Sequence, residues 1–155
     1  MITELIPVIN TIITFGLEPN LTVKKTDRDK LLEKSLVKIY SLYFDIQYDY
    51  DNTDFGEDQE YRYAEIRKNI ESNFPDFGFY KTIPDLMDPD NKDHFGMGDA
   101  ADDLTDIILD LLEIKRRIEY NSLNDGLWYF EFIFSAHTRQ HLIDLLNYLK
   151  QKDWQ

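Results

Sequence analysis

Residues 127–149, LWYFEFIFSAHTRQHLIDLLNYL, predict a long amphipathic helix close to the end of the sequence. Six of its side chains recur at alternating steps of four and three residues, which places them on one helical face. They are Phe130, Phe134, His137, His141, Asp144 and Tyr148. The first part of the stretch also fits a β-strand, because aromatic residues occupy alternate positions from 128 to 134. We favour the helix because the run continues without a break into residues 137–149, whose apolar spacing is helical.

The preceding segment, residues 99–118, carries an acidic stripe with the same alternation of steps. Its members are Asp99, Asp103, Asp106, Asp110 and Glu113. The stripe borders an apolar helical face instead of lying opposite it, so Asp103 and Asp110 are expected at the edge of the core, half buried. We therefore expect the acidic stripe and the histidine-bearing face to meet.

The rest of the sequence predicts an all-α, single-domain bundle of about five helices spanning residues 1–155. Apolar residues at helical spacing indicate three earlier helices, in residues 2–16, 26–43 and 61–74. Thr3 and Thr26 are candidate caps for the first two, and Gly16 is expected to stop the first. The candidate cap of the fourth helix is Asp99 or Asp102, and that of the fifth helix is Ser122 or Asn124.

Two connections differ in composition from these helices. Residues 45–60 are rich in acids and tyrosine, and Gly56 stands at position eight of a possible calcium loop that needs glycine at position six. We expect an acidic inter-helix loop there. Residues 76–98 form a long connection with prolines and glycines before the last two helices. Its aromatic residues are expected to pack onto the body of the protein: Phe77, Phe79, Tyr80 and Phe95.

Composition limits the partners and the compartment. The formal net charge of -13 repels the phosphate backbone, so nucleic acid is not expected as a partner, whereas a basic protein or a divalent cation is compatible. No segment is long and apolar enough to predict a membrane span. The chain contains no cysteine, which fits a reducing compartment, and we expect a cytoplasmic location. The oligomeric state is not predicted.

The last two helices resemble a bacterial family of domains of unknown function. The residues that carry the resemblance, within positions 100–149, are Asp102, Asp103, Leu104, Asp106, Ile107, Asp110, Leu111, Leu127, Trp128, Phe130, Phe132, Phe134, His137, His141, Asp144 and Leu146. Thr138 and Arg139 depart from the Trp-Gly that the family often has after the first histidine. The resemblance implies an all-helical bundle and no particular activity.

Histidines four residues apart on one helix can bind the same metal ion. His137 and His141 have this spacing, and the carboxylates of Asp144, Asp103, Asp106 or Asp110 could complete the set of ligands. Mixed imidazole and carboxylate ligands suit zinc, iron or manganese. One hypothesis is therefore a metal-dependent helical-bundle hydrolase, although the sequence lacks the Glu-x-x-His pairs of helical di-metal proteins.

A structural explanation of the same residues is a polar lock, in which each histidine donates a ring N–H to an aspartate of the facing helix. Breaking such a buried pair would cost roughly 3–5 kcal/mol. On this view no cofactor is expected, and the leading expectation is a non-enzymatic, acidic protein-interaction or regulatory domain that binds a basic partner.

Overall fold

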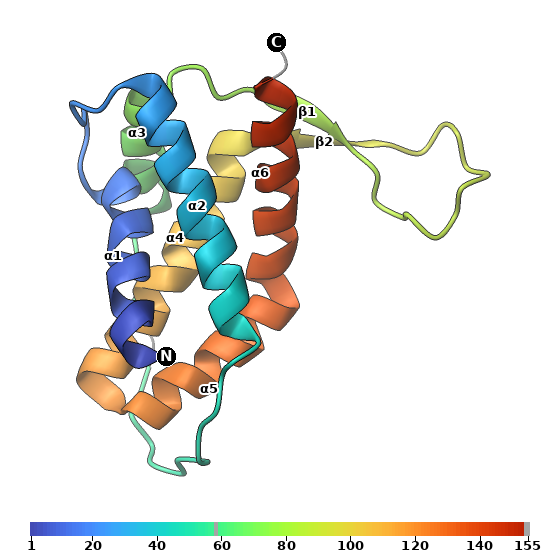
Figure 1. The fold of residues 1–155 in the computed structure, drawn as a ribbon. Coiled ribbons are helices and arrows are strands. Elements are labelled where there is room, and N and C mark those ends of the chain that lie inside the picture. Colours follow the sequence, from blue (N-terminus) through green and yellow to red (C-terminus); the bar gives the residue numbers. More distant parts are fainter. Residues whose placement is uncertain (58, 154–155) are drawn as a thin grey trace.

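The computed structural model describes residues 1–57 and 59–153 (Figure 1). Its elements follow in the order α1 (Ile2–Leu17), α2 (Lys25–Tyr43), α3 (Tyr63–Asn73), β1 (Phe79–Thr82), β2 (Gly96–Asp99), α4 (Ala100–Arg116), the π-helical turn η1 (Arg117–Asn121), α5 (Leu123–Ile133), the π-helical turn η2 (Phe134–Thr138) and α6 (Arg139–Lys152). Because α5, η2 and α6 are continuous, the described residues form five helical rods. The predicted helical bundle is confirmed, with a small two-stranded sheet that was not expected.

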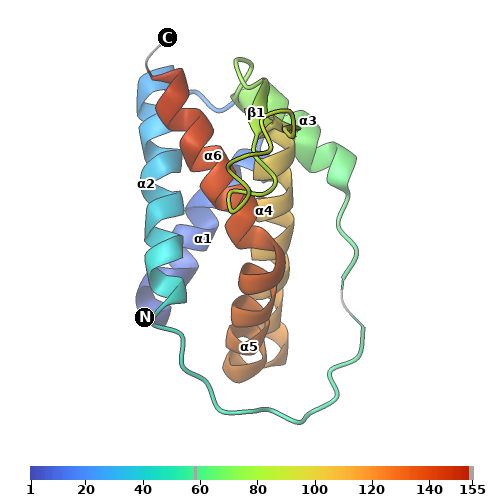
Figure 2. The same cartoon turned by 90° about the vertical axis from the view of Figure 1, so that its right-hand side faces the viewer.

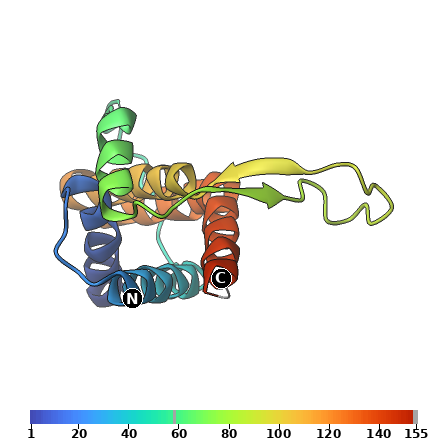
Figure 3. The ribbon, with the colours of Figure 1, turned by 90° about the horizontal axis from the view of Figure 1, so that it is seen from above.

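One core lies between α1, α2, α4 and α6, which surround it when the molecule is viewed from above (Figure 3). Helix α3 packs on the outside against α1 and α4. Five large apolar residues of α4 are completely buried: Leu104, Ile107, Ile108, Leu111 and Ile114. Burial of each such side chain stabilises the fold by roughly 1.5–3 kcal/mol, so α4 is the central helix of the bundle.

The helix caps follow the predictions at two of four positions. The Asp99 side chain caps α4 by accepting hydrogen bonds from the backbone N–H groups of residues 101 and 102, and Ser122 caps α5. Thr3 and Thr26 were wrong as caps, because both lie inside their helices, which begin one residue earlier. The residues at those two cap positions make no side-chain cap bond, so neither helix start depends on one.

Gly16 does not stop α1 but lies within it, buried between two other helices. A Cβ atom at this position would lie 2.7 Å from a methyl group of Ile66 in α3 and 3.0 Å from one of Ile108 in α4. Glycine is therefore needed here because three helices approach closely, and α1 ends one residue later, at Leu17.

Strands β1 and β2 pair antiparallel and form a hairpin that projects from the bundle (Figures 1 and 3). The expectation that the aromatic residues of this connection pack onto the body is correct for Phe77 and Tyr80 and wrong for two others. The side chains of Phe79 and Phe95 are 71% and 60% exposed. Alternate residues of a strand face opposite sides, so Phe79 points outward where Tyr80 points toward α4.

The acidic loop between α2 and α3 runs around one end of the bundle (Figure 2). The carboxylate of Asp51 accepts hydrogen bonds from the Ser122 hydroxyl, at 2.5 Å, and from the backbone N–H of Thr53, at 3.1 Å. This part of the predicted inter-helix loop is thus attached to the start of α5, while residue 58 lies outside the described residues. None of the described helices combines the length and apolar character that crossing a bilayer requires.

Candidate metal site

The histidine-bearing face and the acidic stripe meet, as the sequence predicts, because α4 and α6 lie side by side (Figure 2). His137 lies in η2 and His141 in α6, while Asp103, Asp106 and Asp110 come from α4. The strand alternative for residues 128–135 is excluded, since this run is helical throughout.

His141 is held by an aspartate through one ring nitrogen. Its Nδ1 lies 2.8 Å from Oδ1 of Asp103, a carboxylate that is almost completely buried. The other oxygen of Asp103, Oδ2, accepts a hydrogen bond from the Tyr80 hydroxyl of strand β1. Both oxygens of this buried carboxylate therefore have partners, which fixes the carboxylate and with it the orientation of the imidazole.

His137 has an equivalent arrangement nearer to the surface. Its Nδ1 lies 2.9 Å from Oδ2 of Asp110, and the Thr138 hydroxyl donates to the same oxygen at 2.7 Å. The His137 side chain is 44% exposed, whereas Thr138 is completely buried. Thr138 thus supports the aspartate that holds His137.

The remaining ring nitrogens of the two histidines face each other. An ionised carboxylate only accepts hydrogen bonds, so each Nδ1 carries a proton, and in a neutral imidazole Nε2 then presents a lone pair. The two Nε2 atoms are 3.2 Å apart, and Oδ2 of Asp106 is 3.5 Å from Nε2 of His141. Three electron-pair donors therefore converge, an arrangement that requires a proton or a cation between them.

These separations match those of ligands around one metal ion. Ligand atoms about 2.1 Å from a zinc ion in tetrahedral geometry are about 3.4 Å from one another. One ligand atom each from Asp106, His137 and His141 lies within 4.8 Å of the others. Asp103 and Asp110 contact the opposite nitrogens of the rings, as carboxylates do in carboxylate–histidine–metal arrangements.

Two groups at the site have raised pKa values. The hydrogen bond to Asp103 raises the pKa of His141, and the negative charge of Asp106 adds to this rise, whereas partial burial opposes it. Partial burial also raises the pKa of Asp106, the nearby His141 opposes this rise, and the neighbouring carboxylates of Asp102 and Asp110 add to it. Both shifts favour the protonated form of the group concerned.

The other members of the predicted stripe have separate roles. Asp144 accepts a hydrogen bond from the Gln140 side chain at 3.0 Å, one turn away from the converging nitrogens. Phe130 and Phe134 are completely buried in the core. The Tyr148 hydroxyl accepts from the backbone N–H of residue 78 and donates to the carbonyl of residue 76, at the base of the hairpin. Of the six residues, Phe130 and Phe134 thus belong to the core and the two histidines to the candidate site. Asp144 pairs within α6, and Tyr148 supports the hairpin.

Sequence reasoning missed Tyr80 and Thr138. Tyr80 belongs to a short strand far from α6 in sequence, and no spacing rule connects it with Asp103. Thr138 follows His137 directly, and only the π-helical turn brings its hydroxyl to the same oxygen of Asp110 that holds His137. Turns of this kind occur frequently at functional sites.

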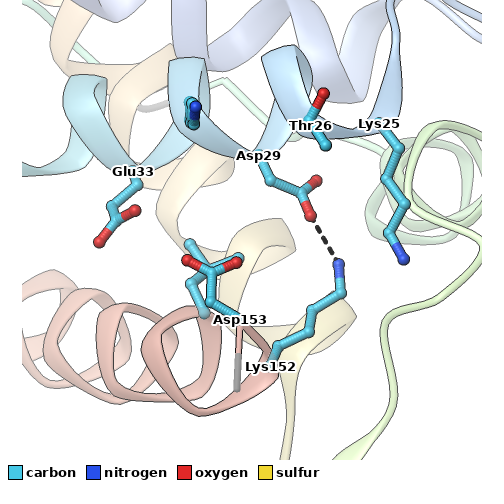
Figure 4. A pocket seen from close by; sticks show the side chains of 8 residues that line it. Lys25, Thr26, Asp29, Glu33, Lys152 and Asp153 are labelled. Carbon is cyan, nitrogen blue, oxygen red and sulfur yellow. Dashed lines mark hydrogen bonds and ion pairs between the residues drawn. The ribbon is translucent and has the colours of Figure 1, made fainter. Parts of the chain in front are cut away.

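A hollow of about 270 Å³ between α2 and the end of α6 offers a different environment (Figure 4). Lys152 lies 2.7 Å from Asp29 there, and Lys25 lies 3.0 Å from Asp76. These two lysines are thus neutralised by aspartates, and the hollow is lined by neither histidine of the pair. The histidine pair is therefore the better candidate for chemistry.

Comparison of the chain with protein-family models, with curated proteins and with solved structures gives no match. The function is therefore inferred from the geometry of the site.

Proposed function

We propose that the protein binds one divalent transition-metal ion through Nε2 of His137, Nε2 of His141 and the carboxylate of Asp106. The observation that carries this proposal is the convergence of the two Nε2 atoms at 3.2 Å while each Nδ1 is held by its own aspartate. Two histidines and one carboxylate suit zinc, iron or manganese.

The same ligand set favours hydrolysis as the reaction. Three protein ligands leave a coordination position for water, and zinc lowers the pKa of bound water to about 7, which provides hydroxide near neutral pH. His137 is the most exposed of the three ligands, so a substrate can approach from its side. We therefore infer a metal-dependent hydrolase of the helical-bundle type.

The polar lock accounts for only one of the two ring nitrogens of each histidine, Nδ1. Hydrogen bonds to Asp103 and Asp110 would orient the rings, but they do not explain why both Nε2 atoms point at each other beside a third carboxylate. A lock requires one extra proton shared between the rings, whereas a metal ion satisfies all three donors at once. The two explanations differ in the role of Asp106, whose charge would favour the shared proton in a lock and whose carboxylate would bind the ion directly in a metal site.

The first prediction concerns Asp106→Asn, which removes a ligand charge and leaves both Nδ1–aspartate bonds in place. Protein purified without a nickel column should contain one equivalent of zinc, iron or manganese. The variant should bind this metal at least about tenfold more weakly, because a carboxylate ligand is lost. Elemental analysis and metal titration measure this, and hydrolysis of simple ester and phosphate-ester substrates should fall in parallel.

The chain provides a matched control in its third histidine, His94, which lies in the hairpin loop away from the pair. His94→Ala should retain the full metal content. Wild-type protein that binds none of the three metals would support the polar lock instead.

A second candidate function is the interaction domain expected from composition, and the hairpin favours it. Six of its apolar side chains are largely exposed: Phe79, Ile83, Leu86, Met87, Phe95 and Met97. Exposed apolar groups of this kind on an acidic chain suit a basic protein partner with apolar anchors.

A further inference from the structure

A chain of two hydrogen bonds links the projecting hairpin to the proposed metal ligand His141. Tyr80 of β1 donates its hydroxyl hydrogen to Oδ2 of Asp103, and Oδ1 of the same carboxylate lies 2.8 Å from Nδ1 of His141. The hairpin therefore touches the site through Tyr80, although its loop extends away from the bundle (Figure 3).

The position of the Tyr80 ring depends on the pairing of the two strands. Tyr80 lies opposite Gly98 in the antiparallel register, and a Cβ atom at Gly98 would come within 2.3 Å of the phenol ring. The ring of Tyr148 lies on another side, with ring centroids 5.4 Å apart. Glycine at position 98 thus leaves room for the phenol to reach Asp103 when the hairpin is formed.

We infer that Tyr80 is a positioning residue, which sets the metal affinity of His141 through Asp103 and thereby couples the hairpin to the metal site. This inference rests on the metal binding proposed above. Without the phenol, Oδ2 of a buried carboxylate would lose its partner, and the carboxylate would be free to turn away from the imidazole. Loss of residues that orient a metal ligand typically lowers metal affinity by about 10–100-fold.

Coupling of this kind acts in both directions. If the Tyr80–Asp103 bond strengthens metal binding, bound metal must stabilise the arrangement of the hairpin that makes this bond. A partner that holds the hairpin in this arrangement would raise the metal affinity of the site, and one that pulls it away would lower it.

The test compares Tyr80→Phe with Tyr63→Phe, which is a closely matched control. Tyr63 also donates its hydroxyl to an aspartate of α4, Asp102, whose other partner among the described residues is Arg67 and not an imidazole. Titration with zinc or cobalt should give a dissociation constant about tenfold higher for Tyr80→Phe. Tyr63→Phe should match the wild type, and the absorption of bound cobalt should change only in the Tyr80 variant.

Hydrogen exchange supplies a readout that a merely structural role would not change. In the wild type, zinc should slow exchange of the amides in β1 and β2, and this protection should disappear in Tyr80→Phe. A Tyr80→Phe protein that binds zinc within twofold of the wild type and keeps the protection would overturn the inference and leave the metal site intact. A wild type that binds neither metal would overturn both proposals.

Discussion

At the scale of single residues, the two ring nitrogens of each histidine have different partners. Nδ1 is fixed by an aspartate, so Nε2 is left as the atom that can bind a cation. His141 and His137 share this division of roles, although one is partly buried and the other is at the surface. What the site can bind therefore depends on which ring nitrogen each aspartate contacts, and the number of histidines and aspartates alone does not determine it.

Asp76 is a second residue whose environment has a measurable consequence. Burial acts to raise its pKa, but the contacts with Lys152 and Lys25 outweigh this and hold the pKa of Asp76 well below its usual range. A carboxylate with a depressed pKa in the folded state stabilises the protein above its unfolded pKa of about 4, and this stabilisation is lost as the pH falls further.

We therefore predict that Asp76→Asn lowers the free energy of unfolding by about 1–2 kcal/mol at pH 7, the value expected for a partly screened charged hydrogen bond. The difference from the wild type should shrink progressively as the pH falls below about 4, because the Asp76 carboxyl of the unfolded chain then becomes protonated while that of the folded protein stays ionised to lower pH. Urea denaturation at each pH measures it. Asp90→Asn, in the exposed hairpin loop, should show no comparable difference at any pH.

Sequence reasoning could identify the residues of the site but not the partner of each. Helical spacing alone places His137 and His141 with Asp103, Asp106 and Asp110 on facing helices. It cannot predict which carboxylate contacts which ring nitrogen, because that depends on the axial offset between α4 and α6 and on the side-chain rotamers. The selection of Asp106 as the third converging group follows only from the coordinates.

At the scale of elements, Gly16 determines how closely α1 approaches α3 and α4. Alanine is the better helix former by about 1 kcal/mol, which would stabilise α1. The added methyl group would however meet the γ2 methyl of Ile66, which belongs to a stiff β-branched side chain, at 2.7 Å. Overpacking of this kind typically costs about 1–3 kcal/mol and should exceed the gain.

We predict that Gly16→Ala lowers the free energy of unfolding by about 1 kcal/mol, as measured by urea or thermal denaturation. The same substitution in an Ile66→Ala background should destabilise the protein less, because the γ2 methyl of Ile66 is gone and only the methyl groups of Ile108 remain. Gly78→Ala, where a Cβ would meet no atom within 4 Å, should change stability little. Destabilisation of equal size in both backgrounds would assign the effect to something other than this contact.

The helices were predictable because their information is local. The apolar spacing that predicts a helix repeats every three or four residues along the chain. The capping side chains of Asp99 and Ser122 directly precede α4 and α5. The hairpin was not predictable from the same information, because its strands, FYKT and GMGD, are four residues long and contain two glycines. Their pairing is specified by contacts at the base, such as Tyr80 with Asp103, and not by the propensity of the strands.

At the scale of the whole molecule, a net charge of -13 and one projecting apolar hairpin define the expected partner. Four aspartates lie in the same loop as the exposed apolar side chains of the hairpin: Asp85, Asp88, Asp90 and Asp93. Long-range attraction should bring a basic partner to the molecule, and apolar contact should retain it.

We predict that a basic protein captured by the wild type is lost with the double variant Leu86→Asp and Met87→Asp, while Val37→Asp on α2 retains it. Val37 is a matched control because it is also an exposed apolar residue. Capture should weaken strongly toward about 0.5 M salt, where charges are screened. Quantitative mass spectrometry of the captured proteins measures both effects, and equal capture by all three proteins would contradict a role for the hairpin.

The π-helical turn at Phe134–Thr138 bears on how such a site can originate. A turn of this type accommodates one surplus residue without changing the register of the helix before or after it, as the buried Phe130 and Leu142 on either side illustrate. A single-codon insertion can therefore add chemistry to an existing bundle helix while its packing is inherited unchanged. Excision of one residue from this turn would restore an ordinary helix.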